Sequence, residues 1–433
     1  MSTTAAAPAP FSPYQKLVVA ILAFLQFTIV LDFMILAPLG ALLMQSMGIT
    51  PRQFGAVVSA YAFSAGTAGL LAAGVADRFD RKKMLLFFYA GFVLGTFLCG
   101  MAPTYGFLLG ARIVTGLFGG VIGSISFAII ADLFPLEVRG RVMGSVQSAF
   151  AASQVMGIPL GVWLSTHYGW HAPFLMIATL AALVGVGIAI KLRPVTGHLK
   201  LSGDHDPVRH LVRTISTPRY LQTFAATMLL ATGGFMLMPF GSAFTVNNLG
   251  IPLTQLHWVY MVTGVASIIA GPLMGRLSDR IGKYPTFCIG TAVTIVAVSI
   301  YCNLGVTPLQ WVMLINIVLF VGVMARMISA SALTTAVPDP QDRGAFMAVS
   351  SSLQQFSGGV ASWVAGLIVV QTPQGPLQRY DVLGWVVVGA MLIMIAMMYP
   401  IHKAVMRKII QARVAAAAAA PPGATPPGDL SHN

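Results

Sequence analysis

The stretch FMILAPLGALLMQSMGI at residues 33–49 recurs in altered form as FMLMPFGSAFTVNNLGI at residues 235–251. The offset of 202 residues also pairs Asp77 with Asp279, so one register extends over two apolar segments and the loop that follows them. Self-similarity at a fixed spacing is the mark of a repeated architecture. The sequence therefore predicts two copies of one structural unit.

Composition places these units in a membrane. Hydrophobic residues make up 57% of the 433-residue chain and charged residues only 9%, against about 25% charged in soluble domains. Apolar stretches of 18 or more residues can each cross a hydrocarbon core of ~30 Å as one α-helix. We predict twelve spans, at 16–44, 53–75, 84–102, 105–131, 141–165, 172–191, 220–246, 255–276, 285–303, 309–336, 344–370 and 381–401.

The repeat and the hydropathy together give an all-α membrane protein with two six-helix repeats around a central cavity. Repeats of this kind are typical of secondary transporters, whose substrate site lies near the midplane between the halves. The predicted parts are an N-terminal tail (1–15), a six-helix bundle (16–191), a linker (192–219), a second bundle (220–401) and a largely disordered C-terminal tail (402–433).

The formal charge of +13 could indicate a nucleic-acid partner, but its distribution along the chain argues against one. Nearly all basic residues fall on the side that contains both termini and the linker, whereas Arg52 and Arg379 fall on the opposite side. This is the positive-inside pattern, so we expect both termini to be cytoplasmic. The basic excess orients the protein and contacts anionic lipid.

Motifs for enzymatic chemistry are missing from the sequence. It has no Gly-x-Ser-x-Gly elbow, no His-Glu-x-x-His and no Walker loop, so the chain is not expected to be a hydrolase, a zinc protease or an ATP-driven pump. Cys99, Cys288 and Cys302 are isolated in apolar surroundings. We therefore expect neither a metal site nor a cofactor.

Five stretches carry a family resemblance. AGVADRFDRKKML (73–85) and GRLSDRIGKYP (275–285) resemble the loop signature of the major facilitator superfamily, and RIVTGLFGG (112–120) resembles its fourth-helix Arg motif. VLDFMILAPL (30–39) and MGIPLGVWLSTHYGWHAPF (156–174) are similar to motifs of its drug:proton antiporter branch. The resemblance implies a twelve-helix fold with two six-helix halves, a monomer in a bacterial inner membrane, and a small-molecule substrate exchanged for protons.

Two intramembrane charges are candidates for proton coupling. Asp32 lies ~24 Å from the cytoplasmic end of the first span, and Arg112 lies ~10 Å from the outer end of the fourth span. Both positions fall in the outer half of the membrane, and the repeat aligns Asp32 with Gly234, so the repeated architecture does not require the carboxylate. Ionisable residues at this depth usually serve a function, although a structural ion pair is the other interpretation.

Other polar and aromatic residues are candidates for lining the cavity, each with helix packing as the alternative. Arg326 is near the middle of the tenth span without an acidic neighbour in that span, so it snorkels, pairs with lipid or backbone, or binds an acidic group of the substrate. The full set of cavity candidates is Gln26, Phe33, Tyr61, Gln147, Gln154, Asn316, Arg326, Gln354 and Gln355.

The loop motifs supply a candidate cytoplasmic gate. In the resembling family, acids and arginines at these positions form a charge cluster that holds the inner side closed. The alternative is topogenic charge with surface pairs, which contribute only about 0–1 kcal/mol. The gate candidates are Asp77, Arg78, Arg81, Asp132, Asp279 and Arg280.

The sequence as a whole predicts a secondary transporter that exports small amphipathic or lipophilic molecules by alternating access. Proton-coupled antiport is the leading interpretation. An uptake symporter or a lipid or organic-anion transporter of the same superfamily is the alternative, since Ile158 departs from the antiporter motif.

Overall fold

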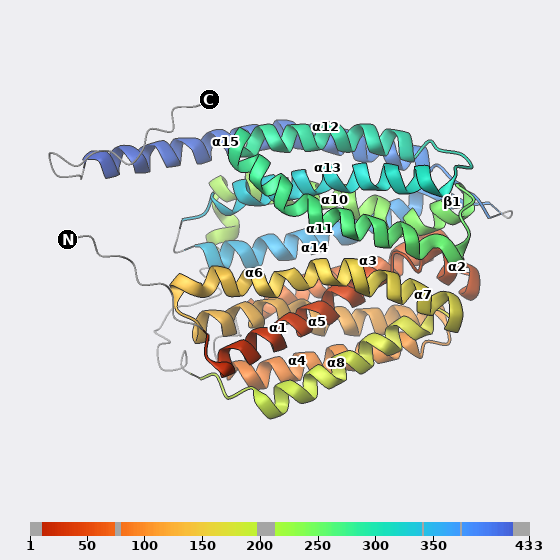
Figure 1. Ribbon diagram of the computed structural model, residues 1–433, viewed down its shortest axis with the longest axis horizontal. Coiled ribbons are helices and arrows are strands. Elements are labelled where there is room, and N and C mark those ends of the chain that lie inside the picture. Colours follow the sequence, from red (N-terminus) through yellow and green to blue (C-terminus); the bar gives the residue numbers. More distant parts are fainter. Residues whose placement is uncertain (1–10, 74–78, 197–212, 340–341, 373–374, 419–433) are drawn as a thin grey trace.

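The structure is a computed structural model in which long helices lie side by side along one axis (Figure 1). It describes residues 11–73, 79–196, 213–339, 342–372 and 375–418. We call the end where α1 and α10 begin the inner end, and the end that holds α2 and the β1–β2 hairpin the outer end.

Helices account for nearly all of the described secondary structure. The long helices are α1 (Pro13–Ile35), α3 (Pro51–Ala73), α4 (Arg81–Gly100), α5 (Tyr105–Leu133), α6 (Leu136–Ala152), α7 (Ile158–Tyr168), α8 (His171–Lys191), α10 (Pro218–Asn247), α11 (Leu256–Ile281), α12 (Lys283–Tyr301), α13 (Leu309–Thr335), α14 (Arg343–Ile368) and α15 (Tyr380–Ala418). The short elements are α2 (Gly40–Met47), the π-helical turn η2 (Ser153–Gly157), the 3-10 turn η4 (Leu253–Gln255), β1 (Val370–Gln371) and β2 (Leu377–Gln378).

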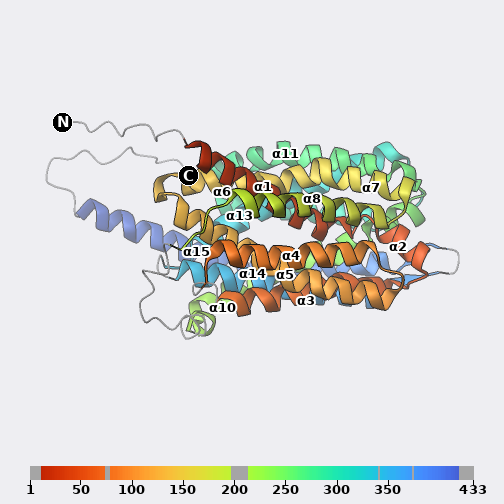
Figure 2. The same cartoon turned by 90° about the horizontal axis from the view of Figure 1, so that it is seen from below.

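Ten of the described helices are long and apolar enough to cross a membrane. The predicted fifth span corresponds to α6, η2 and α7, which lie end to end in both views (Figure 1, Figure 2). The predicted eleventh span corresponds to α14. The helical content and order thus agree with the sequence, and the small antiparallel β1–β2 hairpin is an addition that the sequence did not predict.

Two helix boundaries differ from the prediction. The first predicted span is divided into α1 and α2 by a turn around Pro38, because proline restricts the residue before it and cannot donate a helical hydrogen bond. The last helix, α15, continues to Ala418 and projects beyond the bundle at the inner end (Figure 1, Figure 2). Part of the segment predicted as a disordered tail is therefore helical.

The repeat has a backbone explanation at one pair of glycines. Gly48, which ends α2, has φ of +61°, and its repeat partner Gly250 has φ of +76°. Both values lie in the left-handed region, where a side chain is disfavoured and glycine is the usual residue. The recurring Gly-Ile pair thus marks the same chain reversal at the outer end of each half.

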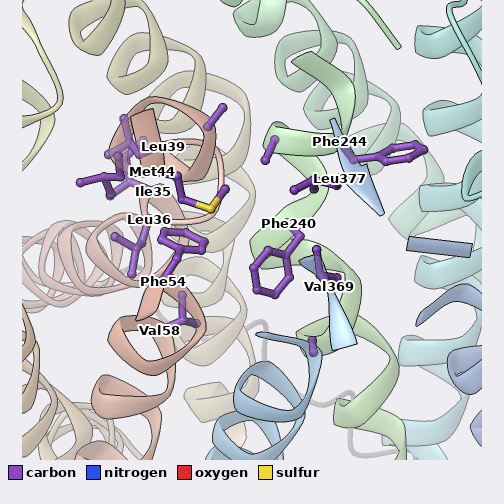
Figure 3. Packing of buried hydrophobic residues seen from close by; sticks show 14 of the residues in the cluster. Ile35, Leu36, Leu39, Met44, Phe54, Val58, Phe240, Phe244, Val369 and Leu377 are labelled. Atoms are coloured by element: carbon purple, nitrogen blue, oxygen red, sulfur yellow. The ribbon is translucent and has the colours of Figure 1, made fainter. Parts of the chain in front are cut away.

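The hydrophobic core differs between the two ends of the bundle. At the outer end one cluster contains residues of both halves, including Phe54 and Phe240, whose ring centroids lie 5.9 Å apart (Figure 3). Toward the inner end each half has a cluster of its own, apart from Leu70 of α3, which packs against the cluster of the second half. The two halves are therefore joined most extensively at the outer end.

Several helix packings make the seam between the halves, among them α2 against α10, where the Ser242 hydroxyl donates to the carbonyl of Ala37 at 2.8 Å. α3 packs along α14, where the Ser59 hydroxyl donates to the carbonyl of Gly359 at 2.8 Å. α11 packs against α7 and η2, where a Cβ added at Gly264 would lie 3.0 Å from the carbonyl of Gln154. Small residues permit this close approach of helix backbones within a membrane.

Candidate functional site

A buried ion pair joins α1 to α5. Arg112 donates from Nη1 to Oδ2 of Asp32 at 2.9 Å, and the two side chains are 1% and 0% exposed. The Thr96 hydroxyl of α4 donates to the other carboxylate oxygen of Asp32 at 3.0 Å. The structure thus brings together the two residues predicted from depth and adds a third helix to the site.

The guanidinium of Arg112 has further contacts in the first half. It lies over the ring of Tyr61 at 4.5 Å from the centroid, an arrangement in which the ring face attracts the cation. Cys99 lies beside it, and the Cys99 sulfur is 3.6 Å from the hydroxyl of Thr115. Nε of Arg112 is buried without a hydrogen-bond partner among the described residues.

Close helix packing positions this pair. A Cβ added at Gly116 would lie 2.5 Å from the Tyr61 carbonyl, and one added at Gly120 would lie 2.4 Å from the Ala65 carbonyl. One added at Gly95 of α4 would lie 2.6 Å from the Thr115 hydroxyl. Gly116 and Gly120 therefore allow α3 to approach α5 closely, and Gly95 allows the same for α4, so the helix that carries Arg112 is packed tightly between its neighbours.

The energy of such a pair depends strongly on its being complete. Removing two charges from water costs several kcal/mol for each ion, and their attraction offsets this only with good geometry and additional hydrogen bonds. The short contact and the Thr96 bond meet that condition. Loss of one partner, by mutation or by protonation, changes the balance, so the pair can act as a two-state element.

An aromatic series leads from the pair to the second half. The rings of Tyr61 and Phe33 lie 5.4 Å apart, and those of Phe33 and Phe235 lie 5.6 Å apart. Beside them is an internal space of about 20 Å³ at the seam, too small for more than a water molecule; it is lined by Phe33, Leu36, Ala37, Val58, Phe235, Met238 and Pro239. The pair is therefore enclosed by packed side chains in this conformation.

The remaining cavity candidates are scattered. Gln154 at η2 is buried with its amide 4.0 Å from the sulfur of Met34, and Asn316 donates to the carbonyl of Val312 within its own helix. Gln26 of α1 is partly buried, as are Gln354 and Gln355 of α14. The side chain of Gln147 lies outside the described part of the structure.

A cavity of about 570 Å³ lies away from the ion pair, between α4 and α8. Its lining includes exposed apolar side chains such as Leu94, Phe97 and Val186. The groove faces outward from the first half, where a membrane would cover it.

Arg326 of α13 is buried in the second half, at 5% exposure. Its Nε has no hydrogen-bond partner, and no ion pair or hydrogen bond joins its guanidinium to any described residue. The two buried arginines therefore have opposite surroundings.

The gate candidates are only partly brought together. Arg81 contacts Asp132 through Nε and Oδ2 at 3.4 Å, which links the start of α4 to the end of α5. Asp77 and Arg78 lie outside the described residues. In the second half, Asp279 pairs with Lys283 one turn away.

Arg280, the last gate candidate, is exposed at the end of α11. The predicted cluster is thus present as one contact between helices in the first half and as a local pair in the second.

Two functional neighbours escaped the sequence reasoning. Thr96 reads as an ordinary threonine in an apolar helix, where its hydroxyl would usually bond its own backbone, and only tertiary structure directs it to Asp32. Asp80 caps α4 by accepting from the backbone N–H of Lys82 at 2.9 Å, and it accepts from the N–H of Val195 at 3.1 Å. An aspartate before a basic helix start was the signal for that cap.

Comparisons with known proteins agree with this architecture. The model described as the Major Facilitator Superfamily matches residues 22–226 and again 223–425. YceJ of Bacillus subtilis, an uncharacterized MFS-type transporter, is 27% identical over 61% of this chain and 67% of its own length. The multidrug resistance protein MdtG of Escherichia fergusonii is 29% identical over 48% of this chain and 52% of its own length.

Solved structures share the fold. The nucleoside transporter NupG matches with a TM-score of 0.71 at 17% identity, covering 88% of this chain and 98% of NupG. A bacterial homolog of the human lysosomal transporter Spinster, inward-facing and unoccupied, matches with a TM-score of 0.67 at 14% identity, covering 92% of this chain and 97% of the homolog. With two family matches that together span most of its length, the chain belongs to the major facilitator superfamily of membrane transporters.

Proposed function

We propose that this transporter is a proton-coupled antiporter that exports small amphipathic or lipophilic molecules by alternating access. The observation that carries the proposal is the completely buried Asp32–Arg112 pair in the first half. An intramembrane carboxylate is costly to keep. When a carboxylate paired with an arginine takes a proton, it loses its charge, and the attraction that holds the ion pair together is weakened.

The absence of this carboxylate from the repeat supports a functional role. Gly234 occupies the equivalent place in α10, and a Cβ added there would meet nothing within 4 Å. The second half therefore folds around the same helix without an acid. The repeated architecture therefore does not require an acid at the position of Asp32.

Apolar surroundings and a nearby guanidinium act in opposite directions on the pKa of a carboxyl group. If the seam beside Phe33 and Phe235 opens, water reaches one side of the Asp32–Arg112 pair. The apolar surroundings of the carboxyl group and its interaction with the guanidinium then change together. In the proposed cycle a proton from the outer side breaks the Asp32–Arg112 contact. The halves then rearrange, and the proton leaves on the inner side as substrate moves outward.

The hydrophobic core is shared by both halves at the outer end and divided between them toward the inner end. This difference supports a separate gate at each end. At the outer end we propose that the apolar cluster shared by both halves stabilises the closed state. At the inner end we propose that the Arg81–Asp132 contact, with Asp77 and Arg78, stabilises the alternative closed state. The inner end is assigned to the cytoplasm of a bacterial cell on the basic charge that gathers there, and the monomer is the proposed unit.

The drug-resistance name of MdtG supports export of amphipathic molecules as the substrate class. The test uses purified protein in liposomes with an acidic interior and three fluorophores: ethidium as a cation, N-phenylnaphthylamine as a neutral probe and anilinonaphthalene sulfonate as an anion. Asp32→Asn preserves shape and removes the charge. We expect it to reduce pH-driven accumulation by at least about tenfold, the change that ~1.4 kcal/mol of lost coupling produces.

Exchange of the same fluorophore without a pH gradient should survive in Asp32→Asn, which shows that the variant is folded. Asp381→Asn is the matched control, because Asp381 is an exposed carboxylate at the outer end of α15, and it should accumulate substrate normally. Full pH-driven accumulation by Asp32→Asn would make the pair structural and end the proposal.

A further inference from the structure

The charges inside the helical bundle do not balance. Of the 12 acidic residues in the sequence, Asp32 alone lies well inside a predicted span. Asp32 already forms an ion pair with Arg112, with 2.9 Å between Oδ2 and Nη1. Arg326 is the single charged residue of α13. The described interior thus carries one cation that the protein itself does not neutralise.

Arg326 cannot easily reach water at the end of its helix. Nine residues separate it from Thr335 at the inner end of α13, a rise of ~14 Å. One turn toward that end, Ser329 is buried and donates to Ser278 of α11 at 3.3 Å. The path along this face of the helix is therefore filled by a packed contact between helices.

The other side of Arg326 is fixed by α12. A Cβ added at Gly290 would lie 3.1 Å from the backbone nitrogen of Arg326 and 3.0 Å from the carbonyl of Gly322. This close approach packs the backbone of α13 at Arg326 tightly against α12. The guanidinium is thus held in the interior by packing on both sides.

A buried, unpaired guanidinium is expensive. Its burial costs several kcal/mol unless an anion and hydrogen bonds compensate it, and Nε has no partner among the described residues. A guanidinium presents its N–H groups in a fork that matches a carboxylate, sulfonate or phosphate. An acidic group that arrives with a ligand would supply the missing partner.

We propose that Arg326 binds the acidic group of the transported molecule, so that the substrates of this transporter are amphipathic organic anions. The inference rests on the proposed transport function and names its substrate class. One bound anion cancels the charge that the interior carries in excess. A neutral or cationic amphiphile would leave Arg326 uncompensated or add to its charge.

The test measures binding, which does not require a proton gradient. Anilinonaphthalene sulfonate and N-phenylnaphthylamine share one ring system and differ by the sulfonate. Equilibrium dialysis of both probes against purified protein compares wild type, Arg326→Gln and Arg326→Lys. Arg276→Gln is the matched control, because Arg276 is an exposed arginine at the inner end of α11.

Wild type should bind the sulfonate more tightly than the neutral probe. Arg326→Gln should raise the Kd of the sulfonate by at least about tenfold, equivalent to ~1.4 kcal/mol, and leave the neutral probe unchanged. Arg326→Lys should retain part of the preference, since it keeps the charge and loses the fork. Arg276→Gln should behave as wild type.

Equal binding of both probes by wild type overturns the inference even if no variant can be purified. An unchanged sulfonate Kd in Arg326→Gln overturns it as well. Its failure is distinct from failure of the proposed function: pH-driven accumulation of ethidium that survives Arg326→Gln would support coupling and reject the anion site. Sulfonate binding that depends on Arg326, with no pH-driven transport, would support the anion site and reject proton coupling.

Discussion

The two halves of the transporter share a helix plan and differ in their buried charge. In the first half, Arg112 has a carboxylate and an aromatic face as partners. In the second half, Arg326 has no ion pair or hydrogen bond to any described residue. A repeat preserves what the fold needs, which here is glycines and apolar faces. Charges that break the repeat are therefore the places to look for function.

The inner ends of the halves also differ. In the first half Asp80 caps α4 and accepts from Val195, which anchors the chain after α8. In the second half Asp339 joins three elements, since it accepts from Lys408 of α15 and from Arg219 of α10. At the inner end, exposed charges thus join the last helix to the second half in addition to its apolar packing.

The largest expected effect comes from making the same change in both halves. Arg112→Gln leaves Asp32 buried without its cation, so we expect a loss of about 3–5 kcal/mol of stability. Arg326→Gln removes a cation that has no partner, so we expect a gain of about 1–3 kcal/mol. Thermal unfolding of the purified, unliganded variants in detergent measures both, with Arg112→Lys and Arg326→Lys as charge-preserving controls.

Equal losses in both variants would contradict the comparison, because they would show that Arg326 has a stabilising partner as Arg112 does. A gain in stability at the cost of anion binding would fit a site that is strained until its ligand arrives, as functional sites often are.

Much of this arrangement could be predicted from the sequence. Counting residues along each span placed Asp32 and Arg112 at a similar depth in the membrane. The repeat showed that Gly234 of the second half occupies the position of Asp32. The membrane fold with two repeats is confirmed. These features are readable because hydrophobic length and helical rise are local properties of the chain.

Other features depend on contacts between segments far apart in the sequence. The bond from Thr96 to Asp32 needs the rotation of α4 about its axis, which an evenly apolar helix does not reveal. The closed outer end depends on how Phe54 and Phe240 meet across the seam. The extension of α15 was missed because its charged face resembles a solvated tail until Lys408 is seen against Asp339.

A second pair of substitutions compares backbone packing between the halves. Alanine at Gly120 of α5 would place its Cβ 2.4 Å from a carbonyl of α3, whereas alanine at Gly234 of α10 would meet nothing within 4 Å. We expect Gly120→Ala to cost about 1–3 kcal/mol by overpacking. Gly234→Ala should gain up to about 1 kcal/mol from helix propensity.

Thermal unfolding of purified Gly120→Ala and Gly234→Ala, together with their expression levels, measures these changes in stability. A neutral Gly120→Ala would mean that α3 and α5 can separate without loss, and the fixed geometry around Arg112 would then need another explanation.

The smallest effect concerns the inner end of the second half and its response to pH. The Lys408 ammonium, which donates to Asp339 at 2.9 Å, and the Arg219 guanidinium hold the pKa of the Asp339 carboxyl below its usual value of 3.8. A lowered pKa in the folded state stabilises the protein above the unfolded-state pKa, and this stabilisation is lost as the pH falls through the folded-state pKa.

Because these side chains are about 37–53% exposed, solvent screening limits the contribution to at most about 1 kcal/mol. Wild type should therefore unfold at a slightly higher temperature than Asp339→Asn at about pH 7, and the difference should shrink as the pH falls below 3.8 and through the lowered folded-state pKa of Asp339. Asp279→Asn is the control, since the Asp279–Lys283 pair lies within four residues of chain and joins no distant elements. A difference between wild type and Asp339→Asn that grows as the pH falls would contradict the assigned sign. Equal unfolding temperatures at about pH 7 would mean that α15 is held to the second half by its apolar contacts alone.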